Sequence, residues 1–200
     1  MDPNPYDAGD QMLIVSKRFL RWLAATALFI PLSVAAAAPA PDSSTASYEI
    51  DFLEGMIDHH AMAVQTASLC EGRAVHPELL SMCSQIVSTQ QQEIATMQSW
   101  LQDWYGVTHQ PEMNPGAMRE MEKLAALSGA EFEIAFMQMM IKHHQSAVRE
   151  GAQCMDRAYH EELRTMCEDI VVTQTLEIGQ MREWLCEWYQ ICGNTRRTRP

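Results

Sequence analysis

The sequence predicts an all-α fold, an antiparallel four-helix bundle built from two duplicated helical hairpins. The first observation is an internal repeat. Shifting the chain by 84 residues aligns residues 51–105 with residues 135–189 without a gap and gives 26 identities in 55 pairs. The second observation is that apolar residues in each copy recur at spacings of three and four, which is typical of amphipathic helices. Two such hairpins bury their apolar stripes economically by packing together, so we expect pseudo-two-fold symmetry between the copies.

Each copy is expected to contain two helices. In the first copy no proline interrupts the apolar spacing from Phe52 to Cys70, so this stretch is predicted to be helical. Gly72, His76 and Pro77 mark a turn, after which the same spacing continues over residues 79–105. The expected segments are a first hairpin repeat at 48–106, a linker at 107–130 with a short helix at 117–127, a second hairpin repeat at 131–190 and a C-terminal tail at 191–200.

Residues 1–37 are predicted to be a signal peptide. A basic segment precedes an apolar run at residues 22–34, and the alanines ending at Ala37 suit cleavage by a signal peptidase. Met12 is an alternative start. The competing interpretation is an uncleaved membrane anchor, although the apolar run is shorter than the roughly 20 residues that a span needs. In either case the protein is exported, to the periplasm or outside the cell, and residues 38–47 are expected to form a flexible leader.

The composition argues against nucleic acid as a partner. The chain has 14 Lys and Arg against 26 Asp and Glu, a formal net charge of -12, which repels a phosphate backbone unless basic residues cluster. No basic group in the sequence is interleaved with stacking aromatic residues. By contrast, 15 methionines, seven histidines and six cysteines in 200 residues are an unusual supply of soft and borderline metal ligands.

The six cysteines are predicted to form three disulfide bonds. In an exported protein, two cysteines on either side of a helical turn are expected to staple the hairpin, and the repeat supplies two such pairs. The remaining two cysteines are expected to join and hold the C-terminal tail. The predicted pairs are Cys70 with Cys83, Cys154 with Cys167, and Cys186 with Cys192. Free buried thiols are the alternative.

The predicted disulfide in the first hairpin also sets the register of its two helices. Because the residue numbers of antiparallel neighbours have a constant sum, His60 is expected opposite Glu93, and Met56 opposite Met97. Met56 and His60 are four residues apart and share a helix face. The second copy gives the equivalent set of His144, Glu177, Met140 and Met181, with Gln90 and Gln174 one turn away in the two copies.

His59 and His143 point elsewhere, because successive helical residues differ by about 100°. They are expected to face a neighbouring helix, such as the symmetry-related copy, or solvent. The candidate metal ligands are His59, His60, His143, His144, Met56, Met140, Met97 and Met181, with Glu93, Glu177, Gln90 and Gln174 as the residues that orient them. Imidazole and thioether groups together suit copper, Cu(I) rather than Cu(II), and a carboxylate beside a histidine fixes its tautomer.

Other interpretations of the same residues stay open. A histidine beside a buried glutamate also occurs as a hydrogen-bonded core pair, and a methionine stripe as core packing. Weaker surface or loop sites could use Met62, Met113, Met118, Met121, Met137 and Met139. Catalysis is not expected, since the chain has no Glu-x-x-His and no H-E-x-x-H, G-x-S-x-G, Walker or C-x-x-C motif. His76 and His160 are expected to be turn or capping residues.

The repeated pattern F-x₃-M-I-x-H-H-x₂-A-V, at residues 52–64 and 136–148, resembles the exported bacterial family known as domain of unknown function 305. The segments L-S-G-A-E-F at 127–132 and Q-x₂-E-I-x₂-M-x₂-W-L at 174–185 are similar to it as well. The resemblance implies a ferritin-like bundle of two-helix repeats and, from some members, copper binding or copper tolerance in the periplasm. It points to His59, His60, His143 and His144. The cysteine staples depart from the pattern, as does Lys142, which stands where the first copy has Asp58.

The sequence thus predicts an exported protein that binds copper for sequestration or delivery. Its expected partners are the metal ion and a copper-handling protein. An aromatic edge formed by the tryptophans at the bundle end could also support a homodimer. The alternatives are a metal-free structural or interaction module, in which the His–Glu pairs fix helix register, and, less favoured, a redox enzyme.

Overall fold

The structure is a computed structural model that describes residues 38–113 and 115–192; the predicted signal peptide and most of the predicted tail lie outside them. The helices of the described part are α1 (Ser43–Ser68), α2 (Pro77–Tyr105), α3 (Pro115–Ala125), α4 (Gly129–Arg157) and α5 (Glu161–Tyr189), and no strand occurs among these residues. The prediction of an all-α fold is therefore confirmed. No helix in this part of the chain is long and apolar enough to cross a membrane.

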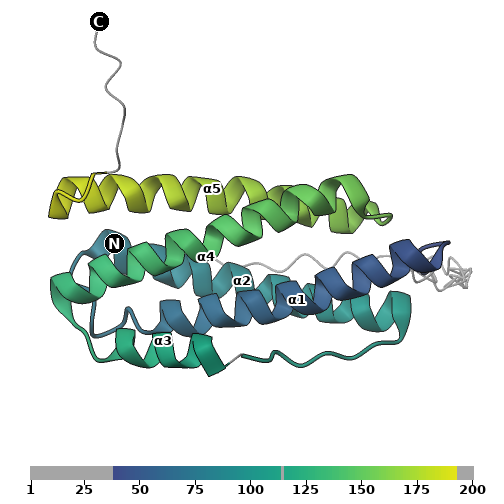
Figure 1. Cartoon of the computed structure of the whole chain (residues 1–200), viewed down its shortest axis with the longest axis horizontal. Coiled ribbons are helices and arrows are strands. Elements are labelled where there is room, and N and C mark those ends of the chain that lie inside the picture. Colours follow the sequence, from purple (N-terminus) through teal and green to yellow (C-terminus); the bar gives the residue numbers. More distant parts are fainter. Residues whose placement is uncertain (1–37, 114, 193–200) are drawn as a thin grey trace, which may run out of the picture. The chain divides into compact units, whose positions relative to one another are not determined.

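The helices pack as two hairpins, α1 with α2 and α4 with α5 (Figure 1). The hairpins meet where α1 packs against α4, and the short helix α3 lies against α4. Two clusters of buried apolar side chains form the core. One contains Met140 and Met181, and the other contains Met56 and Met97.

The start of α1 differs from the expected flexible leader. The helix begins at Ser43 because the Asp42 carboxylate accepts a hydrogen bond from the backbone N–H of Thr45 (2.8 Å) and caps the first turn. Helix α2 ends at Tyr105, and Gly106 caps it with a φ of 67°, which suits a residue without a Cβ. The linker helix α3 spans Pro115–Ala125, two residues earlier than expected.

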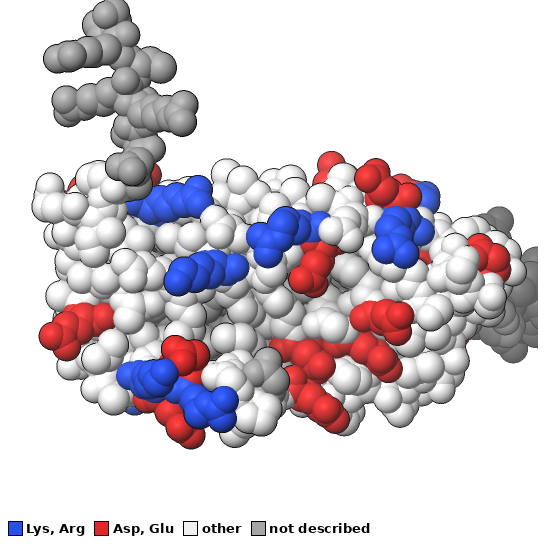
Figure 2. Space-filling view, in the orientation of Figure 1, with Lys and Arg blue, Asp and Glu red and all other residues white. Residues whose placement is uncertain are grey.

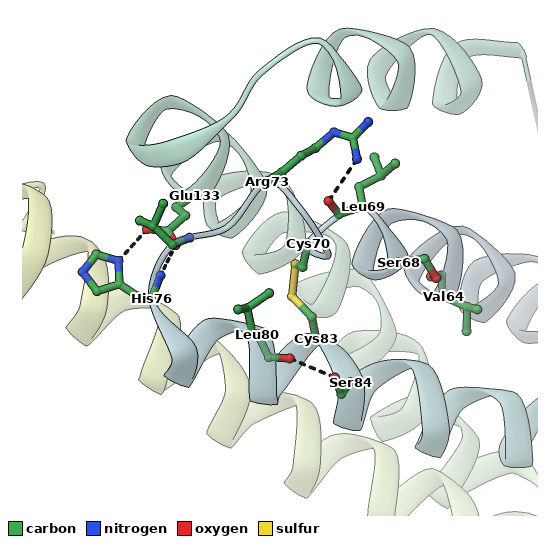
Figure 3. The surroundings of a disulfide bond; sticks show 11 residues. Val64, Ser68, Leu69, Cys70, Arg73, His76, Leu80, Cys83, Ser84 and Glu133 are labelled. Atoms are coloured by element: carbon green, nitrogen blue, oxygen red, sulfur yellow. Dashed lines mark hydrogen bonds and ion pairs between the residues drawn. A yellow bond between two sulfur atoms is a disulfide. The ribbon is translucent and has the colours of Figure 1, made fainter.

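All three predicted disulfide bonds are present: Cys70–Cys83, Cys154–Cys167 and Cys186–Cys192. Figure 3 shows the first of them beside the turn between α1 and α2. The cross-link joins the two helices of one hairpin close to their connection, so it limits the conformations of the unfolded chain more than it adds contacts to the folded one.

We therefore expect a Cys154→Ser/Cys167→Ser variant to lower the free energy of unfolding by about 3 kcal/mol on the chain-entropy model. Urea denaturation followed by circular dichroism measures this loss. The matched control is Cys186→Ser/Cys192→Ser, whose smaller loop predicts a loss of about 2 kcal/mol. Equal or reversed losses would show that the disulfides do not act through loop closure.

A buried glutamate from α1 fastens the first hairpin to the turn of the second. Glu49 Oε1 accepts hydrogen bonds from the backbone N–H groups of Tyr159 (2.6 Å) and His160 (2.9 Å). His160 donates through Nδ1 to Glu49 Oε2 (2.6 Å), and the Tyr105 hydroxyl donates to the same oxygen. Burial alone would raise the pKa of Glu49, but these hydrogen bonds outweigh it, so the pKa lies below its ordinary value. His160 also stacks on Trp104, with ring centroids 3.8 Å apart.

We call these contacts of Glu49 with the turn of the other hairpin a lock. The repeat gives an equivalent lock, formed by Glu133, at the other end of the bundle. Glu133 of α4 accepts from the backbone N–H groups of Val75 and His76 and from His76 Nδ1, and the last of these contacts is 2.6 Å long (Figure 3). Tyr189 donates its hydroxyl to Glu133, and Trp188 stacks on His76 at 3.8 Å. Each repeat thus holds the turn of the other, and this fixes the relative position of α1 and α4, which carry the paired histidines.

Candidate metal centre

The histidines of the two repeats face each other where α1 and α4 meet. His59 lies over His143 with ring centroids 3.6 Å apart and an interplanar angle of 32°. His59 donates through Nε2 to the carbonyl oxygen of His143 (3.1 Å), and Nε2 also lies 2.9 Å from Ser146 Oγ. Because a carbonyl oxygen only accepts, the hydrogen of His59 is on Nε2, and Nδ1 keeps its lone pair. The sequence leaves two alternatives for His59, a neighbouring helix or solvent. In the structure His59 faces α4, the equivalent helix of the other repeat.

The second histidine of each pair points into its own hairpin, toward a glutamate. His60 Nε2 lies 2.8 Å from Glu93 Oε2 and forms a hydrogen bond with it. His144 Nε2 is also 2.8 Å from Glu177 Oε2, but the angle there is not that of a hydrogen bond. Both histidines are fully buried. The register derived from the predicted disulfides therefore gives the correct partner in each hairpin.

Several ring nitrogens of these histidines are buried and unpartnered. His59 and His60 each have Nδ1 without a hydrogen bond, and His143 and His144 have neither Nδ1 nor Nε2 bonded. A buried polar atom without a partner costs free energy, so such atoms are rare in folded proteins. Neutral imidazole nitrogens are also the atoms that bind copper and zinc.

Burial keeps the stacked histidines neutral. It lowers the pKa of His59 to about 3, with further lowering from His60 and His144 nearby. It lowers the pKa of His143 to about 2, again with a contribution from the other three histidines. Both rings are thus unprotonated at neutral pH, which is the form that coordinates a metal.

The predicted sulfur ligands are all buried in the apolar core. Met56 and Met97 lie in one core cluster, and Met140 and Met181 lie in the other. The two methionines of each predicted pair therefore belong to the same core cluster. Their exposed fractions are 0–1%, so these methionines contribute to packing whatever else they bind.

Other methionines line surface cavities next to the stacked histidines. A cavity of about 370 Å³ is lined by Met62 and Met113 together with His59 and His143. A second cavity, of about 530 Å³, is lined by Met62, Met139 and His143. The linker forms one wall of the first cavity, because Asp58 binds His109 Nε2 (2.8 Å) and accepts from the backbone N–H of Glu112 (2.7 Å). From the sequence, these methionines are expected only as weaker sites. The linker has no counterpart in the repeat, so the sequence does not show that it packs here and completes the first cavity.

The remaining methionines named as weaker sites differ from these. Met137 is buried in the core, Met118 is exposed on α3, and Met121 of α3 is half-buried. Among residues 38–113 and 115–192, no three His, Cys, Asp or Glu side chains converge in a way that would hold a metal ion. The centre itself offers imidazole nitrogens, and the adjoining cavities offer methionine sulfur, a combination of ligand types that suits copper.

The charged surface is mixed. In the view of Figure 2, the Lys and Arg side chains are interspersed with Asp and Glu rather than gathered into one basic surface.

The fold and the centre define a class of protein: a helical bundle of two tandem two-helix repeats, with a double histidine in the first helix of each repeat meeting at the repeat interface. The chain belongs to the family described as Domain of unknown function (DUF305), whose model matches residues 49–185. Searching the curated proteins gives no match.

Solved structures of similar proteins include forms with bound metal. CopM in the Cu(I)-bound form is 30% identical over 70% of this chain and 97% of that chain, with a TM-score of 0.64. The Cu(II)-bound form of CopM is 30% identical over the same shares, with a TM-score of 0.65. A DUF305 fragment from Deinococcus radiodurans is 27% identical over 74% of this chain and 98% of that chain, with a TM-score of 0.63.

Proposed function

We propose that this protein is exported and binds copper, as Cu(I), for sequestration or for delivery to a copper-handling partner. The observation that carries the proposal is the stacked pair His59 and His143, whose buried, neutral ring nitrogens lie beside methionine-lined cavities. Thioether sulfur is a soft ligand that favours Cu(I), and imidazole accepts both oxidation states. The similarity to CopM, which has been solved with Cu(I) and with Cu(II), supports the choice of metal.

In this proposal the residues have three roles. His59 and His143 bind copper that enters past Met62, Met113 and Met139. The buried set from the sequence analysis would extend the centre inward: His60, His144, Met56, Met97, Met140 and Met181. Glu93 and Glu177, with Gln90 and Gln174 one turn away, orient His60 and His144.

Export is part of the same proposal. The predicted signal peptide at residues 1–37 lies outside the described residues, and three disulfide bonds are typical of an oxidising compartment such as the periplasm. A sequestering or delivering protein needs no substrate site and no turnover, so catalysis forms no part of the proposal.

An anaerobic Cu(I) competition titration of the chain from Ala38 onward, against a chromogenic chelator, tests the proposal. We expect stoichiometric binding that is lost in His59→Ala/His143→Ala. The triple variant Met62→Leu/Met113→Leu/Met139→Leu should bind at least tenfold more weakly. Its matched control is Met118→Leu/Met155→Leu, which alters two exposed methionines that line neither cavity.

Two results would contradict the proposal. If the native chain does not compete for Cu(I), the histidine centre is architectural and the metal-free structural module is the better interpretation. If the control methionines matter as much as the cavity methionines, copper binds at exposed sulfur and not at this centre.

A further inference from the structure

A second polar site lies between α2 and α5, the later helices of the two hairpins. It is a small cavity of about 10 Å³, enough for one water-sized occupant. Each helix contributes the same four positions of the repeat. The lining residues are Ile86, Thr89, Gln90 and Glu93 of α2, and Ile170, Thr173, Gln174 and Glu177 of α5.

The two glutamines supply unpartnered acceptors to this cavity. Gln90 is 3% exposed and Gln174 is 2% exposed, and in both the side-chain carbonyl oxygen Oε1 is buried without a hydrogen bond. An amide oxygen without a partner costs free energy in a protein interior. Because the two amides come from equivalent positions and line one small space, a single occupant can satisfy both.

The two glutamates add more acceptors to the same space. Glu93 uses Oε2 to bind His60. Glu177 Oε2 is buried and has no hydrogen bond. Ionised carboxylates and amide oxygens only accept hydrogen bonds. The unpartnered acceptors around this space are therefore Gln90 Oε1, Gln174 Oε1 and Glu177 Oε2. One water molecule has two hydrogens, so it cannot satisfy all three, whereas a cation can be bound by all of them.

The local charge also favours a cation. Within the described residues, the ion-pair partners of Glu93 and Glu177 are histidines, and no Lys or Arg pairs with either carboxylate. Glu93 and Glu177 both line this small space, so two negative charges lie beside it. A divalent ion between them would neutralise both.

We propose that Glu93, Glu177, Gln90 and Gln174 bind one hard divalent cation, of the class of Mg²⁺ or Mn²⁺, between α2 and α5. Oxygen-only donor sets select hard cations over copper, and the small cavity favours a small ion. The hydroxyls of Thr89 and Thr173 line the cavity and are available as further oxygen ligands. The oxygen donors of this site differ from the nitrogen and sulfur donors of the copper centre, although Glu93 and Glu177 also contact His60 and His144 of that centre. The proposal does not depend on copper binding.

The test is a Mn²⁺ titration of the copper-free protein, expressed with its own N-terminal segment and stripped with chelator. The electron paramagnetic resonance signal of free Mn²⁺ reports binding. We expect one equivalent to bind per chain and the midpoint of thermal unfolding to rise, by roughly 5–10 °C at a hundredfold excess over Kd. Mg²⁺ is expected to displace Mn²⁺, whereas Ca²⁺, which is larger, should compete less well.

The decisive variant is Gln90→Leu/Gln174→Leu, which removes both amide oxygens and leaves the glutamates that bind the histidines. It should fold, and it should lose stoichiometric Mn²⁺ binding and the thermal shift. Its matched control is Gln91→Leu, an exposed neighbour on α2, which should bind as the native chain does. Glu93→Gln/Glu177→Gln should also abolish binding.

Three results would overturn the proposal. The first is no binding to the native chain at millimolar Mn²⁺, which would leave water as the occupant. The second is binding that survives in Gln90→Leu/Gln174→Leu, which would place the ion on the acidic surface. The third is a binding loss in Gln91→Leu equal to that in the double variant. None of these results bears on copper, since the titration contains none.

Discussion

Replacing Glu49 by alanine is expected to lower the free energy of unfolding by about 3–5 kcal/mol, because it leaves several buried hydrogen-bond donors without an acceptor. The Glu49 carboxylate is fully buried and accepts from two backbone N–H groups, one imidazole and one hydroxyl. The alanine variant would leave the N–H groups of Tyr159 and His160 and the Nδ1 of His160 without an acceptor. Each unpaired buried group costs about 1–3 kcal/mol. Urea denaturation of the metal-free protein measures the loss.

Three further variants show whether the loss comes from this lock. Asp51→Ala, an exposed change two residues away on α1, should be within about 0.5 kcal/mol of the native chain. Glu49→Gln keeps one acceptor for the backbone but cannot accept from His160 through its amide nitrogen, so its loss should be intermediate. Glu133→Ala should match Glu49→Ala, because it breaks the equivalent contacts at the other end. A loss below about 1 kcal/mol for both alanine variants would show that the locks contribute little.

The register of one hairpin does not predict these locks. The repeat and the turn signals place His76 and His160 at the turns, but they do not give the glutamates that bind them. Glu49 and Glu133 are separated by the same 84 residues, immediately before the aligned region, and extending the comparison by two residues would have found them. The contact itself joins opposite repeats, and a register derived within one hairpin cannot predict such a contact.

In the candidate centre too, the contacts within one hairpin are predictable from the sequence and the contacts between hairpins are not. The partners His60 and Glu93 follow from the register of one hairpin, because a disulfide and helical geometry set that register. The stacking of His59 on His143 depends on how two hairpins dock, and the sequence left it as one of several options. The methionine-lined cavities depend on the linker, which occurs once in the chain and has no repeat partner to reveal its position. Repeat and register thus predict contacts inside a hairpin well and contacts between hairpins poorly.

The second large effect is an acid destabilisation caused by the stacked histidines. The pKa values of His59 and His143 are about 3 and about 2 in the folded protein, because burial disfavours the charged rings, and about 6.5 in the unfolded chain. Below pH 6.5 the unfolded chain therefore takes up protons that the folded protein does not. Stability is present above pH 6.5 and falls as the pH drops toward the folded values. Between pH 7 and pH 5 the two residues together should lower the free energy of unfolding by about 4 kcal/mol.

Urea denaturation of metal-free protein at pH 7, 6 and 5 measures this dependence. His59→Gln/His143→Gln should lose most of the slope, because glutamine does not titrate. Glu49 and Glu133 contribute little to the change in the free energy of unfolding between pH 7 and pH 5. Their pKa values are lowered by hydrogen bonds that outweigh burial, so the stability they add is lost only below about pH 4.5. An unchanged slope in the double variant would place the titrating groups elsewhere in the chain.

The same low pKa values make a second, independent prediction about copper. Protons compete with metal for imidazole nitrogen, so an exposed histidine with a pKa near 6.5 loses more than tenfold of its metal affinity between pH 7 and pH 5. His59 and His143 are already unprotonated across this range, and thioether sulfur does not take up a proton. The Cu(I) affinity of the folded protein should therefore change by less than about threefold from pH 7 to pH 5 in a competition titration whose chelator is calibrated at each pH. A tenfold or greater fall would mean that copper binds through histidines outside the stacked pair. His76, whose side chain is 33% exposed, is the first candidate to test.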